Sequence, residues 1–178
     1  MNLKENFKGH LETVNHHRKE VRRLCFKLGL YKQGIMHDLS KYSPQEFISG
    51  VIYYSGTKSP NTAERQLTGK SEAWLHHTGR NRHHFEYWTD YGVNSGEGMQ
   101  GIEMPVKYVV EMFCDRVAAC KTYYRDSYND SLPFEYFMKS RSHYMIHPKT
   151  ERLLGKLLVM LKKYGEEETL CYIKNRVL

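Results

Sequence analysis

The chain has 178 residues and a formal net charge of +7. The length limits the number of domains, and the charge limits the kinds of binding partner. The length suits one domain with a sizeable hydrophobic core. The basic balance suits either a soluble protein with a lysine-rich surface or an anionic partner, which would be a small phosphorylated molecule or nucleic acid. Lys and Arg are not gathered in runs, so nucleic acid is the weaker of these two partners.

No apolar stretch is long enough for a membrane span or a signal peptide, so we expect a cytoplasmic protein without membrane association. The four cysteines form no CxxC pair, which is typical of free thiols in a reducing compartment. The sequence leaves the oligomeric state open, and a homo-oligomer is compatible with it.

The N-terminal part of the chain is predicted to be helical. Apolar residues recur at helical spacing from Leu3 to Leu28, and Gly29 suits the position just past a helix end. A second, short helix begins at about Tyr31 and leads into His37-Asp38.

A third helix and a loop are expected next. Ser43-Pro44-Gln45-Glu46 is a capping-box pattern, and it predicts a helix that runs to about Tyr54. Ser55 to Gly69 is rich in small and polar residues and is predicted to be a surface loop. Its basic residues would suit either a solvated loop or a basic lid over an anionic substrate: Lys58, Arg65 and Lys70.

The middle of the chain is predicted to contain two short helices, a loop and one long helix. The short helices cover 71–77 and 83–88, separated by a break at 78–82. The Gly-rich segment 90–101 is expected to be exposed. Pro105 opens a long helix to about Tyr124 with a wide apolar stripe.

The C-terminal part continues the helical pattern. A helix is expected from Pro133 to about His143, and an amphipathic helix around 153–164 should end near Gly165, followed by a short helical tail. No segment shows a convincing strand alternation. The sequence therefore predicts a single all-α domain over 1–178.

Histidines cluster in the segment from Trp74 to Trp88, which holds four of the ten histidines as two adjacent pairs. Histidine is the commonest metal ligand in proteins. His37-Asp38 lies upstream and Asp115 lies downstream, on different predicted helices. Such a spread of His and Asp predicts a metal centre assembled from several helices.

The His37-Asp38 pair needs a particular backbone to act on one ion. Adjacent residues of a regular helix point about 100° apart, which suits chelation poorly. Leu39-Ser40-Lys41 follows at once and indicates a helix end, where the backbone can turn and both side chains can reach one site.

These residues resemble the HD-domain metal-dependent phosphohydrolases, in which a His, a His-Asp pair, further His and a late helical Asp follow in this order. His37-Asp38-Leu39-Ser40-Lys41 is similar to their His-Asp-(Ile/Leu)-Gly-Lys motif, with Ser40 in place of Gly. This resemblance covers roughly the first two-thirds of the chain. It implies an HD-like helical bundle with a metal-site core at about 7–125 and C-terminal helices at 133–178.

A narrower resemblance covers nearly the full length. The segments 37–47, 77–84 and 111–115 look like those of an uncharacterised bacterial and phage family related to the HD superfamily, some of whose members carry a catalase label. 

The resemblance implies a set of metal ligands, with Asp38 able to bridge two ions. The early histidine is assigned to His17, with His10 as the alternative. His16, His76 and His143 are read as ordinary surface or hydrogen-bonded residues. The implied ligands are His17, His37, Asp38, His77, His83, His84 and Asp115.

The implied activity is hydrolysis of a phosphomonoester or nucleotide, with one or two divalent ions (Fe, Mn, Co, Zn, Ni or Mg) as cofactor. The candidate catalytic residues are Asp38, Lys41 and Glu111; the last of these would orient a ligand, take a proton or form an ion pair. The candidate substrate-binding residues are Arg80, Arg82 and Lys149.

Two other functions fit the same residues. A di-metal redox protein would also use His and carboxylate ligands in a helical core, although only two candidate carboxylates lie near the motifs. The second alternative is a metal-binding protein without catalytic activity.

Overall fold

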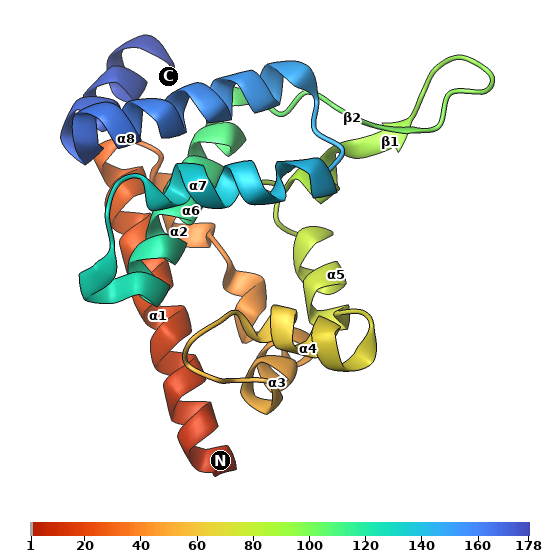
Figure 1. Cartoon of the computed structure of the whole chain (residues 1–178), viewed down its shortest axis with the longest axis vertical. Coiled ribbons are helices and arrows are strands. Elements are labelled where there is room, and N and C mark those ends of the chain that lie inside the picture. The colour runs from red at the N-terminus through yellow and green to blue at the C-terminus, as the bar shows by residue number, and fades with distance from the viewer. Residues whose placement is uncertain (1) are drawn as a thin grey trace.

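The hydrophobic core lies between three long helices, α1 (Leu3–Lys27), α6 (Val106–Tyr124) and α8 (Pro148–Arg176) (Figure 1). The computed structural model describes residues 2–178. Each helix contributes several fully buried side chains, and burying one aliphatic side chain stabilises the fold by about 1.5–3 kcal/mol. The buried side chains with no exposed surface include Val21, Leu24, Val110, Phe113, Val117, Leu154, Leu157 and Leu158.

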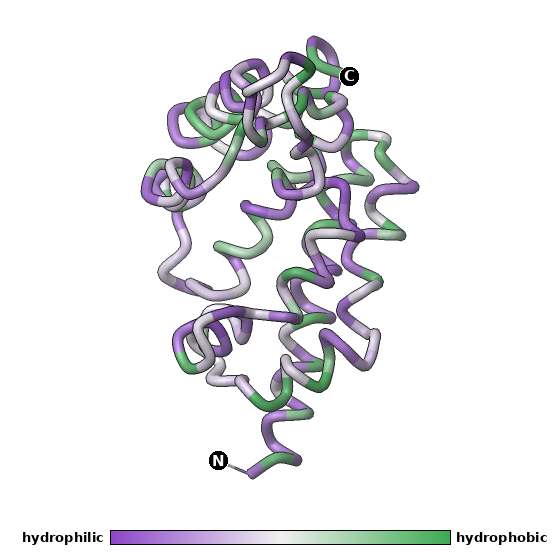
Figure 2. Tube along the Cα trace, turned by 90° about the vertical axis from the view of Figure 1, so that its right-hand side faces the viewer, coloured by the Kyte–Doolittle hydropathy of each residue, from purple (hydrophilic) through white to green (hydrophobic). Residues whose placement is uncertain are grey.

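The shorter helices surround the three long ones on several sides (Figure 1). Two of them, α3 and α4, pack together near the N-terminus, whereas α7 lies against α8 at the opposite end (Figure 1). Hydrophobic and hydrophilic residues alternate along the helices, as expected of amphipathic helices packed on a core (Figure 2). The shorter α-helices are α2 (Tyr31–Met36), α3 (Pro44–Ile52), α4 (Pro60–Thr68), α5 (Glu72–Thr78) and α7 (Leu132–Ser140).

The all-α prediction is confirmed: within residues 2–178 the strands are limited to β1 (Thr89–Tyr91) and β2 (Met99–Gly101). These two strands form an antiparallel hairpin that projects from the bundle (Figure 1). The sequence predicted no strand here, because three residues are too few to show a period-two alternation. Four 3₁₀ turns complete the elements: η1 (Leu39–Tyr42), η2 (Phe85–Trp88), η3 (Arg125–Ser127) and η4 (Arg141–His143).

The expected surface loop at 55–69 was wrong in part, because α4 forms within it. Pro60 occupies the first turn of α4, and Gly69 ends it with a φ of 81°. These are ordinary start and stop signals, but the polar composition between them hides the helix. Glu64 is buried on the inner face of α4 and accepts a 2.5 Å hydrogen bond from Ser71 Oγ, which ties α4 to the start of α5.

The predicted helix at 83–88 is a 3₁₀ turn, η2, that starts only at Phe85. The predicted break near Gly165 is confirmed, because Gly165 interrupts α8 with a φ of 81° and a ψ of 177°. Within residues 2–178, no helix combines the length and the apolar character that crossing a bilayer requires.

Candidate metal centre

The backbone turns sharply at the end of α2 and brings His37 and Asp38 to one place. His37 follows the last helical residue and has an extended ψ of 126°, whereas Asp38 has a φ of +52°. A non-glycine residue with positive φ is uncommon and costs backbone energy. The turn cancels the divergence of neighbouring helical side chains, so both residues reach a common centre, as the sequence predicted.

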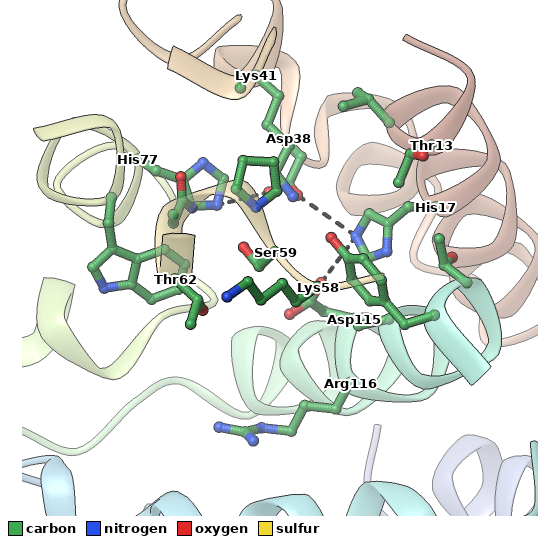
Figure 3. Close-up of a pocket in the computed structure, with 18 of the residues that line it drawn as sticks. Thr13, His17, Asp38, Lys41, Lys58, Ser59, Thr62, His77, Asp115 and Arg116 are labelled. Atoms are coloured by element: carbon green, nitrogen blue, oxygen red, sulfur yellow. Dashed lines mark ion pairs between the residues drawn. The ribbon is translucent and has the colours of Figure 1, made fainter. Parts of the chain in front are cut away.

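A first ligand group combines residues of α1, the α2 end and α6. His17 Nε2 lies 3.0 Å from Asp115 Oδ1 and 3.6 Å from Asp38 Oδ2. His37 Nε2 lies 3.4 Å from Asp38 Oδ2 and 3.5 Å from Asp115 Oδ1. Figure 3 shows His17 and Asp115 directed toward each other from α1 and α6. The first ligand group is therefore His17, His37, Asp38 and Asp115.

A second ligand group uses the other oxygen of Asp38. Asp38 Oδ1 lies 3.3 Å from both His77 Nε2 and His83 Nε2. His84 Nε2 lies 3.0 Å from His77 Nε2. His77 comes from α5, and His83 and His84 precede η2. The second ligand group is therefore Asp38, His77, His83 and His84.

The spacing of these atoms fits metal ions. Ligands about 2.1 Å from an ion stand about 3.0–3.4 Å apart in octahedral or tetrahedral geometry, and the distances above fall close to this range. Within residues 2–178, Oδ1 of Asp38 and Nε2 of His83 are buried without a hydrogen-bond partner, whereas Oδ2 of Asp38 pairs with Lys41 Nζ at 2.6 Å. Buried polar atoms are rarely left unpaired, and a cation between Asp38 Oδ1 and His83 Nε2 would satisfy both.

Glu111 lies behind both ligand groups. Its Oε1 accepts hydrogen bonds from His37 Nδ1 at 3.0 Å and from His83 Nδ1 at 3.2 Å. A proton on Nδ1 leaves Nε2 free as a ligand atom, which is how outer carboxylates orient metal-binding histidines. Glu111 therefore acts through one histidine of each group, and this position favours an orienting role over proton transfer.

Glu46 does the same for the second group alone. Its Oε2 accepts from His77 Nδ1 and its Oε1 from His76 Nδ1, both at 2.7 Å. The predicted capping box at Ser43 is wrong, since Ser43 makes no side-chain cap and Glu46 turns inward instead. The buried histidines compete successfully for this carboxylate because a charged partner is worth more to them than to a solvent-accessible helix end.

The turn that returns the chain from His77 to His83 is held by Asn81. Its Nδ2 donates to the His77 carbonyl oxygen and to Ser40 Oγ, both at 2.8 Å. This turn brings His77 of the first pair and both histidines of the second pair to Asp38 and to one another. The conclusion that 78–82 breaks the helix and lets both pairs converge is confirmed for His77, His83 and His84.

The electrostatics of the cluster show why a cation suits it. Burial would raise the pKa of Asp38, but His37 and Lys41 hold it well below its usual range. Burial lowers the pKa of His37, yet the carboxylates around it, Asp38 first, outweigh burial and raise it to about 10. Without an ion, a proton on His37 helps to balance the buried carboxylates, and a divalent ion would replace that proton.

The cluster forms one wall of a cavity of about 580 Å³. Lys41 Nζ lies 2.6 Å from Asp38 Oδ2 and also faces this cavity. Lys58, Ser59 and Thr62, from the start of α4 and the segment before it, border it as well (Figure 3). Aromatic side chains cover other parts of the wall: Trp74, Phe85, Tyr123, Tyr136 and Tyr144.

The three predicted substrate-binding residues lie outside the cavity. Arg80 and Arg82 are exposed; Arg80 donates to the His76 carbonyl, and Arg82 contacts Tyr87 and Tyr108. Lys149 pairs with Glu103 at 2.9 Å on the surface. The break at 78–82 turns its arginines outward as it turns the histidines inward, so neighbours in sequence separate in space.

His17 rather than His10 joins the cluster. The ring of His10 packs against Gly50 of α3, where any Cβ would clash with it, and burial lowers its pKa to about 4. His16 and His143 are exposed, in line with the prediction from the sequence. His76 is linked to the cluster only by its hydrogen bond to Glu46.

Sequence reasoning missed Glu46 and Arg116. Glu46 was hidden by its fit to a capping box, and its sequence separation of 31 residues from His77 leaves no local signal. Arg116 lines the cavity directly after Asp115, and only its place beside a predicted ligand could have singled it out.

Comparisons with known proteins add a family but no function. A family model described as "Family of unknown function (DUF5662)" matches residues 6–160. No curated protein matches the chain, and no solved structure does.

Proposed function

We propose that this chain, which belongs to the family of unknown function DUF5662, is a metal-dependent phosphohydrolase that acts on a small phosphorylated substrate. One observation carries the proposal. The two oxygens of Asp38 face two different ligand groups, so a single buried carboxylate can bridge two divalent ions. Paired ions of this kind are a recurring arrangement for phosphoester hydrolysis.

The order of the ligands along the chain supports the same class. His17, His37-Asp38 and Asp115 follow the order seen in the HD-domain phosphohydrolases that this sequence resembles. Five histidines and two aspartates converge, which suits Mn, Fe, Co, Zn or Ni better than Mg, because Mg²⁺ prefers oxygen ligands and water.

When held by these residues, a divalent ion would contribute a water of lowered pKa and a Lewis-acid contact for a phosphoryl oxygen. The residues of the chain have separate tasks. Glu111 and Glu46 fix the ring orientation of the ligand histidines. Lys41 holds Asp38 by an ion pair and presents a positive charge to the cavity, where it can contact a substrate oxygen.

The charge of the cavity wall favours an anionic substrate. Lys41, Lys58 and Arg116 all line it. Lys41 and Arg116 replace Arg80, Arg82 and Lys149 as the candidates for substrate binding, because Lys58 is exposed and already donates to Gln66 Oε1.

A metal-loaded panel tests the proposal. Purified protein is loaded separately with Mn²⁺, Fe²⁺, Co²⁺, Zn²⁺, Ni²⁺ or Mg²⁺ and assayed against phosphomonoesters and nucleotides, with Asp115→Ala and the exposed Asp126→Ala as matched variants. We expect turnover in wild type and Asp126→Ala and a loss of at least about 100-fold in Asp115→Ala. Equal rates in all three proteins on every substrate would refute hydrolysis, and gas evolution from peroxide by the loaded protein would favour the redox reading instead.

A further inference from the structure

Arg116 occupies an unusual position in the cavity. Asp115 points from α6 toward His17, whereas Arg116 leaves the helix on the other side, away from the His/Asp cluster (Figure 3). Its guanidinium carbon lies 5.5 Å from the centre of the Phe85 ring and 5.3 Å from that of Phe137. Two aromatic rings therefore hold the guanidinium in place without neutralising its charge.

The Arg116 side chain lacks the partners that other arginines of this chain have. Among residues 2–178, its Nε is buried without a hydrogen-bond partner. By contrast, Arg23 pairs with Glu166 at 2.7 Å, and Arg18 donates to the His37 carbonyl at 2.8 Å. A buried donor of a charged group that stays unpaired is costly, and a bound oxyanion would pair with it.

Among the described residues 2–178, the carboxylates of the cavity wall contact other partners, and none forms an ion pair with Arg116. Asp38 and Asp115 face the histidines of the ligand groups. Glu46 accepts from His76 and His77. Glu86 accepts from the indole of Trp74 at 3.2 Å. The counter-charge for Arg116 is therefore expected to come from a ligand.

The volume of the cavity points the same way. About 580 Å³ is within the range of sites for whole small molecules and exceeds what a lone phosphate needs. Resting on the proposed function, we propose that Arg116 forms a second anion-binding subsite, so that the substrate carries a phosphoryl group at the ions and a further phosphate or carboxylate at Arg116. Arginine suits this task because its planar fork binds an oxyanion through two hydrogen bonds.

Lys58 is the rival cation. It lines the same cavity, but its side chain is exposed and its Nζ already donates to Gln66 Oε1 at 2.7 Å. A solvated lysine on a loop is less prepared to bind an anion than an arginine held between two rings. Lys58 therefore serves as the matched control for Arg116.

Binding of non-hydrolysable probes tests the subsite. Calorimetry compares α,ω-alkane bisphosphonates of graded length with n-alkylphosphonates of the same length, on metal-loaded and metal-free protein. The proteins are wild type, Arg116→Met and Lys58→Met; Arg116→Gln is a second neutral variant, and thermal unfolding shows that each variant is folded.

In wild type, we expect one chain length at which the bisphosphonate binds at least about tenfold more tightly than its alkylphosphonate partner, the gain typical of a charge-assisted contact. Arg116→Met and Arg116→Gln should lose this preference, and Lys58→Met should keep it.

The subsite is refuted if no length gives a preference, if neutral variants of Arg116 keep it, or if Lys58→Met alone abolishes it. A failure of the proposed function looks different, because it would make alkylphosphonate binding independent of the metal ions. Carboxylate-bearing phosphonates in place of the bisphosphonates then distinguish a second phosphate from a carboxylate.

Discussion

The two ligand groups that share Asp38 are built in different ways. The first takes His17 and Asp115 from the middle of two long helices, α1 and α6, whose packing forms the core. The second takes His77 from a seven-residue helix and His83 and His84 from irregular chain. Long helices position a ligand through core packing, whereas short segments need dedicated hydrogen bonds, here from Glu46 and Asn81.

The largest effect is expected at Asp38, because this residue belongs to both ligand groups. Asp38→Asn removes the charge shared by both groups and leaves Lys41 and the histidines without their central partner. We expect metal affinity to fall by at least about 100-fold for both ions, since a buried charged ligand is lost. Elemental analysis and calorimetric titration measure this, with the exposed Asp126→Asn as control. Unchanged metal content would remove Asp38 as a ligand.

Glu111→Gln should weaken both groups less severely. Glu111 Oε1 orients His37 of the first group and His83 of the second, so the neutral amide is expected to lower both affinities by about 10- to 100-fold. A two-site titration with Mn²⁺ or Co²⁺ would show both steps shifting. If only one step shifts, Glu111 serves a single group and the shared outer carboxylate is refuted.

The first group should also respond to pH with a definite sign. The pKa of His37 is raised to about 10 by the carboxylates around it, so below that pH an ion must displace its proton. Affinity for the first ion should therefore rise by about tenfold per pH unit between about pH 6 and 8, with one proton released. Calorimetry in buffers of different ionisation enthalpy counts the protons. An affinity that is flat over this range would show that His37 binds no ion or carries no proton.

Glu46→Gln is expected to weaken metal binding at the second ligand group only. Glu46 bonds to His77, which belongs to the second group, and to no residue that belongs to the first group alone. We expect about a tenfold loss for one ion and little change for the other. The two-site titration used for Glu111→Gln distinguishes the cases directly. Equal losses at both ions would mean that the groups are coupled more tightly than their separate supports suggest.

The smallest effects are expected at the surface cations. Arg82→Ala and Lys149→Ala alter side chains that lie outside the cavity, so metal affinity and probe binding should change by less than about twofold, and stability by less than about 0.5 kcal/mol. Binding of alkylphosphonates and thermal unfolding give the comparison with wild type. A large loss in either variant would show that the cavity lined by Lys41 and Arg116 is not where the anion binds.

Local patterns predicted most of the helices because their signals are local. The apolar stripes of α1 and α6 and the glycines that end α1 and interrupt α8 are visible in the sequence alone. The failures occurred where the local pattern was hidden or too short. The polar composition of α4 hides its start at Pro60 and its end at Gly69, and the β1–β2 hairpin has strands too short to leave a pattern.

The sequence by itself determined the fold class, the helix end at His37-Asp38 and the residue types able to hold a metal ion. These follow from periodicity, from turn chemistry and from the ligand preferences of imidazole and carboxylate groups. Only the tertiary structure decided that His17 rather than His10 joins the cluster, that Glu46 orients His77 rather than capping α3, and which cations face the cavity. Those outcomes depend on how helices distant in sequence pack together, because a side chain's direction is fixed locally but its neighbours are not.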